Sequence, residues 1–508
     1  MVLTDVSGKE AIIAATIATL VGAAAAVAPL PTLAVVAAAA AFVMAFFAPR
    51  AAVAIAVLAI LFVRPIERLT SIDGLSYLDE AAVALCVVML PLRRVMARRP
   101  LRTFPGQWWF TGFFVVGILS GVVLHVPPVI YLSGAFVLGK GLLLAWAVAQ
   151  IDWAPRHLVK SARIGTFLMV VSLVACAANL AAPSAWNAVM ASDANAVQPR
   201  SFLPSLIGPF THPIDLGQFM ALSAVAVAAW RAAVRKGPLT MALLIGTVAG
   251  AGLTARRTAA ASLTAAWLTV QAMVRSTRVL LVLVVCLPVA LVLLVGPVTH
   301  VVQVTYHDYI GKGTPEARTV LTLDSFAVAA DHFPAGAGFG RFGSAVAATN
   351  YSPEYLARGY THIWGLGRTA QDGRFLTDTE WPAIIGETGF LGAAMFAMGL
   401  FAIFRAGRRL VRGDGDPLRR WAGLTSVGWL VALLVESVGT VSFTGPPVSG
   451  AFFALVGVVT ALSDPDPTPP DQVGPRQVGR EQVGREQVGR EMAGSHESAL
   501  RADRRPAR

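Results

Sequence analysis

The stretch VIYLSGAFVLGKGLLLAWAVAQ, residues 129–150, is mostly apolar and contains one charged side chain, Lys140. A helix needs about 20 mostly apolar residues to cross the hydrocarbon core of a bilayer, so this stretch predicts a membrane-spanning helix. Lys140 lies near the middle of that helix, where an ammonium group is costly. Either it binds a ligand phosphate or it forms a buried structural pair, and the sequence leaves both open.

Similar apolar stretches occur along most of the chain. Of its 508 residues, 56% are hydrophobic and 14% are charged, whereas soluble domains carry about 25% charged residues. We therefore predict an all-α, polytopic membrane helix bundle of about 12–14 spans. The predicted spans lie near 11–28, 32–48, 50–63, 76–92, 107–124, 129–150, 164–181, 213–230, 239–254, 258–274, 279–300, 382–404, 421–440 and 447–462.

The net charge is +12, and most of the basic residues lie in the loops between these spans. They are concentrated in one set of loops, which includes 93–102, 156–163 and 405–420. Basic loops favour the cytoplasmic side. The pattern therefore predicts a multi-pass protein of the cytoplasmic (inner) membrane with both termini inside, and no nucleic-acid partner.

One long polar segment, 301–381, interrupts the spans and is predicted to face outward. It contains ARTVLTLDSFAVAADHF, whose apolar residues have helical spacing, and loops this long are usually functional or disordered. We predict four regions: membrane spans in 1–300, an extracytoplasmic catalytic loop with short helices in 301–381, further spans in 382–462, and a disordered cytoplasmic tail with QVGRE repeats in 463–508.

Several ionisable residues lie where a membrane protein places few of them. Arg256 and Arg257 occupy an outward turn, where arginine is unfavoured unless an anion is bound. Arg318 begins the predicted helix of the long loop, although a cation opposes the helix dipole there. Asp79 and Glu80 suit the first turn of span 76–92.

Other motifs carry less information. Gly336, Gly338 and Gly340 lie outside any βαβ unit, so they do not indicate dinucleotide binding. His307, His332 and His362 are scattered and lack metal-ligand spacing. Glu387 enters span 382–404, and we expect a neighbouring polar group to satisfy it inside the bundle.

Four segments together resemble the O-antigen ligase and polysaccharide polymerase family of bacterial inner-membrane glycosyltransferases. LIGPFTHPIDLGQFMAL (206–222) is similar to the family's G-x-F-x-H-P-N stretch, and AGLTARRTAAASL (251–263) to its T-x-S-R motif. ARTVLTLDSFAVAADHFPAGAGFGRFG (317–343) resembles the family's R-x(6–10)-P-x-x-G-x-G-x-G-x-F motif. TDTEWPAIIGETGFLG (377–392) resembles its closing box.

The resemblance implies transfer of a saccharide from a polyprenyl-diphosphate carrier to an acceptor glycan at the outer membrane face. Arg257 and Arg318 would bind the diphosphate, with Arg256, Lys140 and His212 as further contacts. Asp378 would be the general base, with Glu380 as the alternative and His362 as a weaker third. No cofactor or metal is expected, and membrane lipid is a further partner.

Two positions depart from the family pattern. Arg256 stands where the family has serine, and Asp378 with Thr379 replaces the His-Asn pair of ligases. Aspartate at that position is typical of polymerases, which favours polymerisation over ligation. Two alternatives remain open: an O-antigen-type ligase attaching finished glycan, and a non-enzymatic flippase or transporter of lipid-linked oligosaccharide.

Overall fold

The computed structural model describes residues 40–464 except 73, 194–195, 200–203, 275–316, 370 and 414. Every regular element within these ranges is a helix, which confirms the predicted all-α class. The predicted spans 11–28 and 279–300, residues 32–39 of the span 32–48, the beginning of the 301–381 loop and nearly all of the tail lie outside the described residues.

The helices follow one another along the chain. Their bounds are α3 Pro49–Thr70, η1 Leu75–Tyr77, α4 Leu78–Met96, α5 Gln107–Val123, α6 Pro128–Ala149, α7 Pro155–Ala181, α8 Pro183–Met190, α9 Pro213–Ala233, α10 Pro238–Gly252, α11 Arg257–Val274, α14 Ala317–Asp331, α15 Ala345–Asn350, α16 Pro353–Ala357, η3 Tyr360–His362, α17 Trp381–Arg412, α18 Pro417–Glu436 and α19 Ser449–Ser463.

Proline marks many of the helix starts. It occupies the first turn of α3, α6, α7, α9, α10 and α18, where its missing N–H would have no helical partner anyway. The predicted spans agree with these helices to within a few residues, except at the charged ends. Helices α3, α7 and α17 extend beyond their apolar runs, because basic residues continue the helix where it leaves the apolar stretch.

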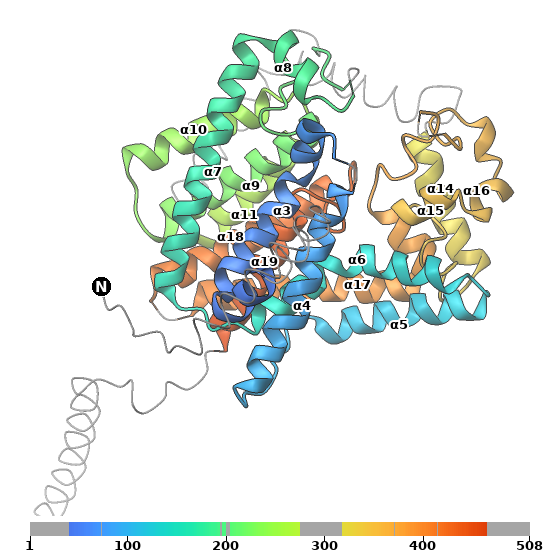
Figure 1. Ribbon diagram of the computed structural model, residues 1–508, viewed down its shortest axis with the longest axis horizontal. Coiled ribbons are helices and arrows are strands. Elements are labelled where there is room, and N and C mark those ends of the chain that lie inside the picture. Colours follow the sequence, from blue (N-terminus) through green and yellow to red (C-terminus); the bar gives the residue numbers. More distant parts are fainter. Residues whose placement is uncertain are drawn as a thin grey trace, which may run out of the picture. The chain divides into compact units, whose positions relative to one another are not determined.

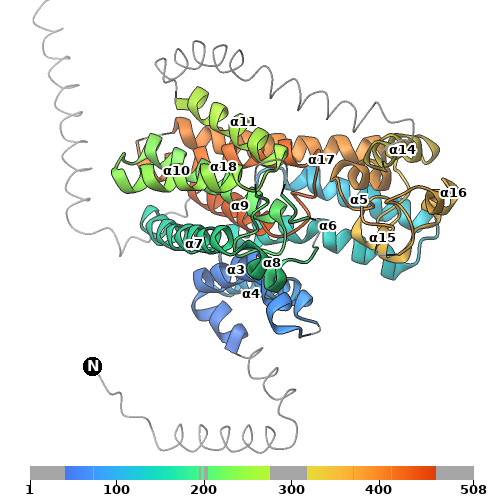
Figure 2. The ribbon, with the colours of Figure 1, turned by 90° about the horizontal axis from the view of Figure 1, so that it is seen from above.

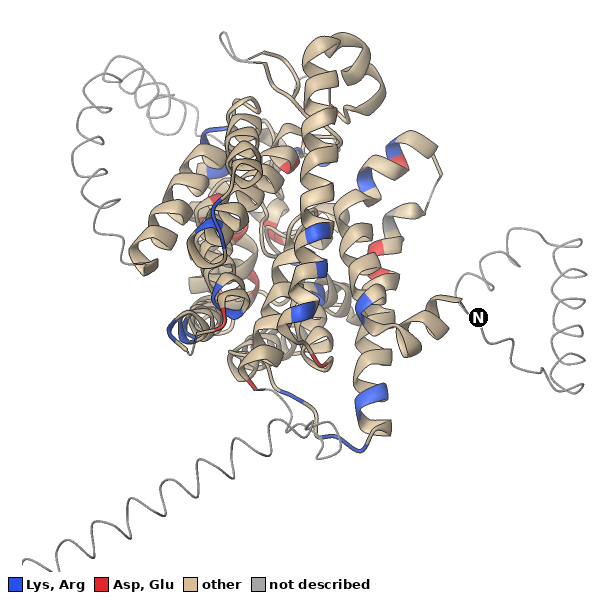
Figure 3. Cartoon of the chain, turned by 90° about the vertical axis from the view of Figure 1, so that its left-hand side faces the viewer, with Lys and Arg blue, Asp and Glu red and all other residues tan. Residues whose placement is uncertain are grey.

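Helices α6, α7, α9, α17 and α18 are long and apolar enough to cross a membrane, and α5, α10 and α19 are shorter apolar helices. On α7, Phe167 and Val174 are 66% and 64% exposed, whereas Ser172 and Asn179 are fully buried. Most residues of the helices are neither acidic nor basic (Figure 3). A helix whose apolar side chains face outward while its polar side chains are buried suggests a membrane protein. The count of 12–14 spans stays a prediction.

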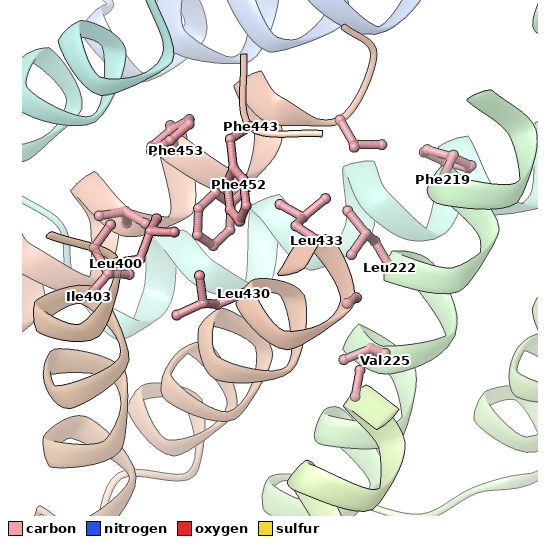
Figure 4. Close-up of a cluster of buried hydrophobic side chains, with 14 of the residues drawn as sticks. Phe219, Leu222, Val225, Leu400, Ile403, Leu430, Leu433, Phe443, Phe452 and Phe453 are labelled. Carbon is pink, nitrogen blue, oxygen red and sulfur yellow. The ribbon is translucent and has the colours of Figure 1, made fainter. Parts of the chain in front are cut away.

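The main core lies where α9, α17, α18 and α19 meet (Figure 4). Phe219, Leu222 and Val225 come from α9, and Leu430 and Leu433 from α18. Helices α11, α18 and α17 run side by side (Figure 2), and α19 packs against α6. The last residues of α18 are thereby held beside the first residues of α11 and α17.

The described part of the long loop is folded. Helices α14, α15, α16 and η3 group together beside one end of α5, α6 and α17 (Figure 1). They enclose a core of their own, in which the buried rings of Tyr355 and Tyr360 stack at 5.2 Å and Phe342 packs against both. This agrees with the expectation of short helices in the loop.

A glycine-rich strap, residues 336–343, docks this group on α17. Ala337 N and Gly338 N donate hydrogen bonds of 2.9 Å to the carbonyl oxygens of Gly386 and Glu387. Gly389 breaks the helical backbone there with φ 65°. A Cβ on Gly336 would lie 2.3 Å from the nitrogen of Gly389, so glycine is required by the close approach of two main chains.

Candidate functional site

Arg318 and Asp378 form a close ion pair within the described part of the long loop. Arg318 is the second residue of α14, and its Nε donates to Asp378 Oδ2 at 2.5 Å while a terminal nitrogen contacts the same oxygen. The guanidinium also stands over the ring of Phe375 at 5.5 Å. Both side chains stay partly exposed, at 26% and 21%. The pair is thus held in place yet accessible.

The pKa of Asp378 is raised from its ordinary value. Burial is the main cause, and the positive charges of Arg318 and Arg256 oppose it. Arg256 therefore lies close enough to act electrostatically on this carboxylate, although it comes from the turn between α10 and α11. The structure brings together residues of two segments that the sequence places more than a hundred positions apart.

The turn bearing Arg256 and Arg257 is fixed from several sides. Arg256 donates to the carbonyl of Ala196 at 3.1 Å, and Leu206 N donates to the carbonyl of Leu253 at 3.1 Å. Arg257 begins α11 and is exposed. The family resemblance implied Arg257 and Arg318 as the main diphosphate-binding cations. In the structure, the arginine of this turn that acts electrostatically on Asp378 is Arg256.

His212 caps α9, the helix that follows the 206–211 segment. Its Nδ1 accepts a hydrogen bond from Ile214 N at 3.2 Å. The preceding segment is held by Asn179, whose side-chain oxygen accepts from Ile207 N and Gly208 N. Gly217, one turn into α9, packs against Ala259 of α11. His212 therefore has a local structural role, and its helix adjoins the arginine turn.

Glu380 is used structurally. Its carboxylate accepts from Ser442 N at 2.7 Å, Phe443 N at 3.0 Å and Thr444 Oγ1 at 2.7 Å, and the residue is only 1% exposed. Burial raises its pKa, and these hydrogen bonds oppose the rise. A carboxylate so enclosed is poorly placed to reach an acceptor hydroxyl. The geometry thus favours Asp378 over the alternative base, Glu380.

A buried polar network joins the 442–444 segment, which binds Glu380, to the membrane helices. Ser262 Oγ of α11 donates to Glu436 Oε1 of α18 at 2.7 Å, and Gln218 of α9 hydrogen-bonds the same carboxylate. Gln218 also donates to Ser442 Oγ at 3.3 Å. Glu436 and the 437–444 connection belong to no motif that the sequence reveals. The sequence signal that could have identified Glu436 is its position as a glutamate near the end of an apolar run.

Two other membrane charges have partners of their own. Lys140 Nζ lies 2.8 Å from Asp79 Oδ2 and 3.8 Å from Glu80 Oε1. Of the two interpretations that the sequence left open, the structure contains the buried pair, which occupies the ammonium group of Lys140. Glu387 accepts from Phe342 N at 3.1 Å and from Ser344 Oγ at 2.6 Å, which confirms its expected polar partner.

The histidines of the long loop give no metal centre among the residues described. His332 contacts Glu354 at 3.3 Å, a carboxylate that also binds Arg341 and Arg358. No group of three or more His, Cys, Asp or Glu residues in the described ranges is placed to hold a metal ion. His307 lies outside those ranges. Metal independence stays a prediction.

The four segments with family resemblance therefore meet around the connection between α18 and α19. Segment 206–222 packs on 251–263, and Thr258 contacts Gly439 of the connection. Glu380 N and Trp381 Nε1 both donate to Ser437, and Arg318 reaches Asp378. Compared with known proteins, the chain matches no family model and no curated protein.

Proposed function

We propose that this chain is an integral membrane glycosyltransferase of the polysaccharide polymerase type. It would transfer saccharide units from a polyprenyl-diphosphate carrier to an acceptor sugar at the outer face of the cytoplasmic membrane. The observation that carries the proposal is the partly exposed Arg318–Asp378 pair with Arg256 beside it. Two cations and one raised-pKa carboxylate from separate segments suit a reaction with an anionic leaving group and a proton to remove.

Asp378 serves as the general base in this mechanism. Both of its contacts with Arg318 use Oδ2, so among the described residues Oδ1 is the oxygen free to accept a proton. The acceptor hydroxyl oxygen attacks the anomeric carbon of the donor sugar as its proton passes to Oδ1. Such general-base assistance contributes typically about 10²–10⁴-fold.

The arginines act on the other half of the reaction. As the bond between the anomeric carbon and the phosphate oxygen breaks, polyprenyl diphosphate leaves with the bonding electrons. Arginine stays charged at any physiological pH and binds phosphate oxygens through parallel N–H groups. Arg318 and Arg256 would stabilise this charge, with the exposed Arg257 of the same turn as a further contact.

The pairing of Arg318 with Asp378 also favours an order of events. Diphosphate oxygens compete with Asp378 for the guanidinium. Donor binding would therefore loosen the ion pair and release the carboxylate for its role as base. A base held by a cation is a poor proton acceptor, so Asp378 becomes an effective base only after the donor has bound.

The experiment that tests the proposal is an analysis of lipid-linked glycans in a strain that lacks the protein. Single repeat units on the carrier in the outer leaflet would support a polymerase. Finished chains left on the carrier would instead indicate a ligase. Repeat units trapped in the inner leaflet would indicate a flippase and would overturn the proposal.

A further inference from the structure

A cavity opens toward the end of the bundle away from Asp378. It has a volume of about 1110 Å³ and is lined by α3, α7, α9, α10, α18 and α19. Pockets for small ligands commonly measure about 300–1,000 Å³. Trp421 lines it near the start of α18, whereas Glu436 ends that helix beside the candidate site. At about 1.5 Å per residue, the two ends lie on the order of 20 Å apart.

The cavity walls are mostly apolar and include Trp153, Trp230, Trp421 and Trp429. Trp421 Nε1 donates to the carbonyl of Ala226 at 3.0 Å, and Trp429 Nε1 donates to that of Leu222 at 2.7 Å. The ring of Trp230 meets that of Trp421 edge-on at 5.1 Å. Because the N–H groups of Trp421 and Trp429 are bound to α9, their rings present apolar surface to the cavity, as in a membrane interface belt.

Cations gather at one end of the same cavity. Lys160 and Arg163 lie in the first turns of α7, and Arg235 lies just after α9. All three are exposed, and the structure gives none of them an ion-pair partner among the residues that it describes. The end is the one that receives the arginine-rich connection before α18, which the charge pattern predicts to be cytoplasmic.

From this combination we infer that the cavity is a binding site for an anionic glycerophospholipid of the inner leaflet. Its phosphate would bind Lys160, Arg163 and Arg235, and its acyl chains would lie along the tryptophan-lined walls. Basic residues beside an apolar groove are complementary to such a lipid in both charge and polarity. This site goes beyond the proposed transfer reaction, whose donor would bind near Asp378.

Two sets of neutralising variants test the headgroup contact. In the first, Lys160, Arg163 and Arg235 are all changed to Gln. In the matched control, Arg405, Arg408 and Arg412 are changed to Gln, which removes the same charge from exposed positions outside the cavity. Binding of dioleoyl phosphatidylglycerol to the purified full-length protein is measured by native mass spectrometry, with dioleoyl phosphatidylcholine as the neutral comparison.

We expect the first variant to bind phosphatidylglycerol about 100-fold more weakly, since each basic residue near a lipid surface contributes about 1 kcal/mol. The control should bind as the wild type does. Equal binding of the two lipids by the wild type, or unchanged binding by the first variant, would overturn the inference. Preference for undecaprenyl phosphate over phosphatidylglycerol would also overturn it, because the site would then belong to the carrier.

A steric variant tests the acyl-chain contact and does not depend on charge. Gly165 lines the cavity, and a Cβ there would meet only the Met169 methyl at 3.9 Å. Gly165→Leu should fill the groove and weaken phosphatidylglycerol binding without disturbing the helix. Gly252→Leu, at a position with open space away from the cavity, is the control. Full lipid binding by Gly165→Leu would place the lipid elsewhere.

Discussion

Arg318 and Asp378 are 60 positions apart in the sequence, yet the arginine binds one oxygen of the aspartate through two nitrogens. Phe375, one turn before Asp378, supports the guanidinium from its face. The aspartate therefore has a defined orientation before any substrate binds. Such preorganisation is what a general base requires if it is to act in a fixed geometry.

Replacing Asp378 with Asn should remove the base while keeping the shape of the side chain. We expect the rate of glycan transfer to fall about 10²–10⁴-fold. The measurement is polymer formation by purified protein with a lipid-linked repeat unit. Asp331→Asn is the control, because Asp331 also pairs with an arginine of this loop but is 63% exposed. An Asp378→Asn enzyme with wild-type activity would remove Asp378 from the mechanism.

Arg318→Lys should be nearly as harmful as Arg318→Ala. Lysine keeps the charge but loses the planar fork that binds phosphate oxygens in parallel. Removing one such stabilising group commonly costs about 10²–10³-fold in kcat. Arg374→Lys, at a cation over Trp364 in the same loop, is the matched control. Full activity in Arg318→Lys would show that a point charge suffices.

The pH dependence of transfer follows from the raised pKa of Asp378. A protonated carboxyl cannot accept the acceptor's proton, so the rate should fall as the pH falls through this pKa. Arg256 lowers the pKa, and Arg256→Gln should therefore raise it further. We expect the acid limb of the pH–rate profile to move to higher pH in this variant. An acid limb at the same pH would mean that Arg256 does not act on Asp378.

Glu380 should behave as a structural residue. Glu380→Ala leaves two backbone N–H groups and one hydroxyl without their acceptor, and each buried unsatisfied group costs about 1–3 kcal/mol. Glu380→Gln keeps one acceptor oxygen and should therefore lose less stability than Glu380→Ala. Thermal unfolding in detergent is the measurement, with the activity of the Gln variant beside it. If Glu380→Gln stays folded but loses the activity that a base supplies, Glu380 rather than Asp378 is the base.

The buried pair of Lys140 and Asp79 can be examined with a double-mutant cycle. Changing only one partner leaves an uncompensated charge inside the bundle and should cost about 3–5 kcal/mol of stability. The double variant Lys140→Met with Asp79→Leu should recover most of that loss and retain transfer activity. Recovery of stability without activity would return Lys140 to the list of donor contacts.

The sequence predicted the helices well because their signal is local. An apolar run of membrane length predicts a helix by itself, and prolines such as Pro128 and Pro213 mark the starts. Partners could not be predicted in the same way. Nothing near Lys140 in the sequence indicates Asp79, since the contact depends on how α4 packs against α6.

The candidate site was predicted in part. The motifs identified Arg318, Asp378 and the turn containing Arg256 as residues that belong together, and the structure brings these three into one electrostatic environment. They did not separate Asp378 from Glu380, because the two are neighbours along the chain. Their difference lies in the 442–444 backbone, which encloses Glu380 and comes from a connection without a motif.

The glycine strap has a consequence for how this protein can change. Its contacts with α17 are made by main-chain atoms of residues 337–338 and 386–387, and the close approach of the two main chains requires glycine at positions 336 and 389. The distance of Arg318 and Asp378 from the kink at Gly389 is thus encoded by where glycines occur. Surface side chains around α15 and α16 can diverge without shifting that distance. The surface of the loop and the placement of the Arg318–Asp378 pair are therefore separable properties, open to independent evolution or redesign.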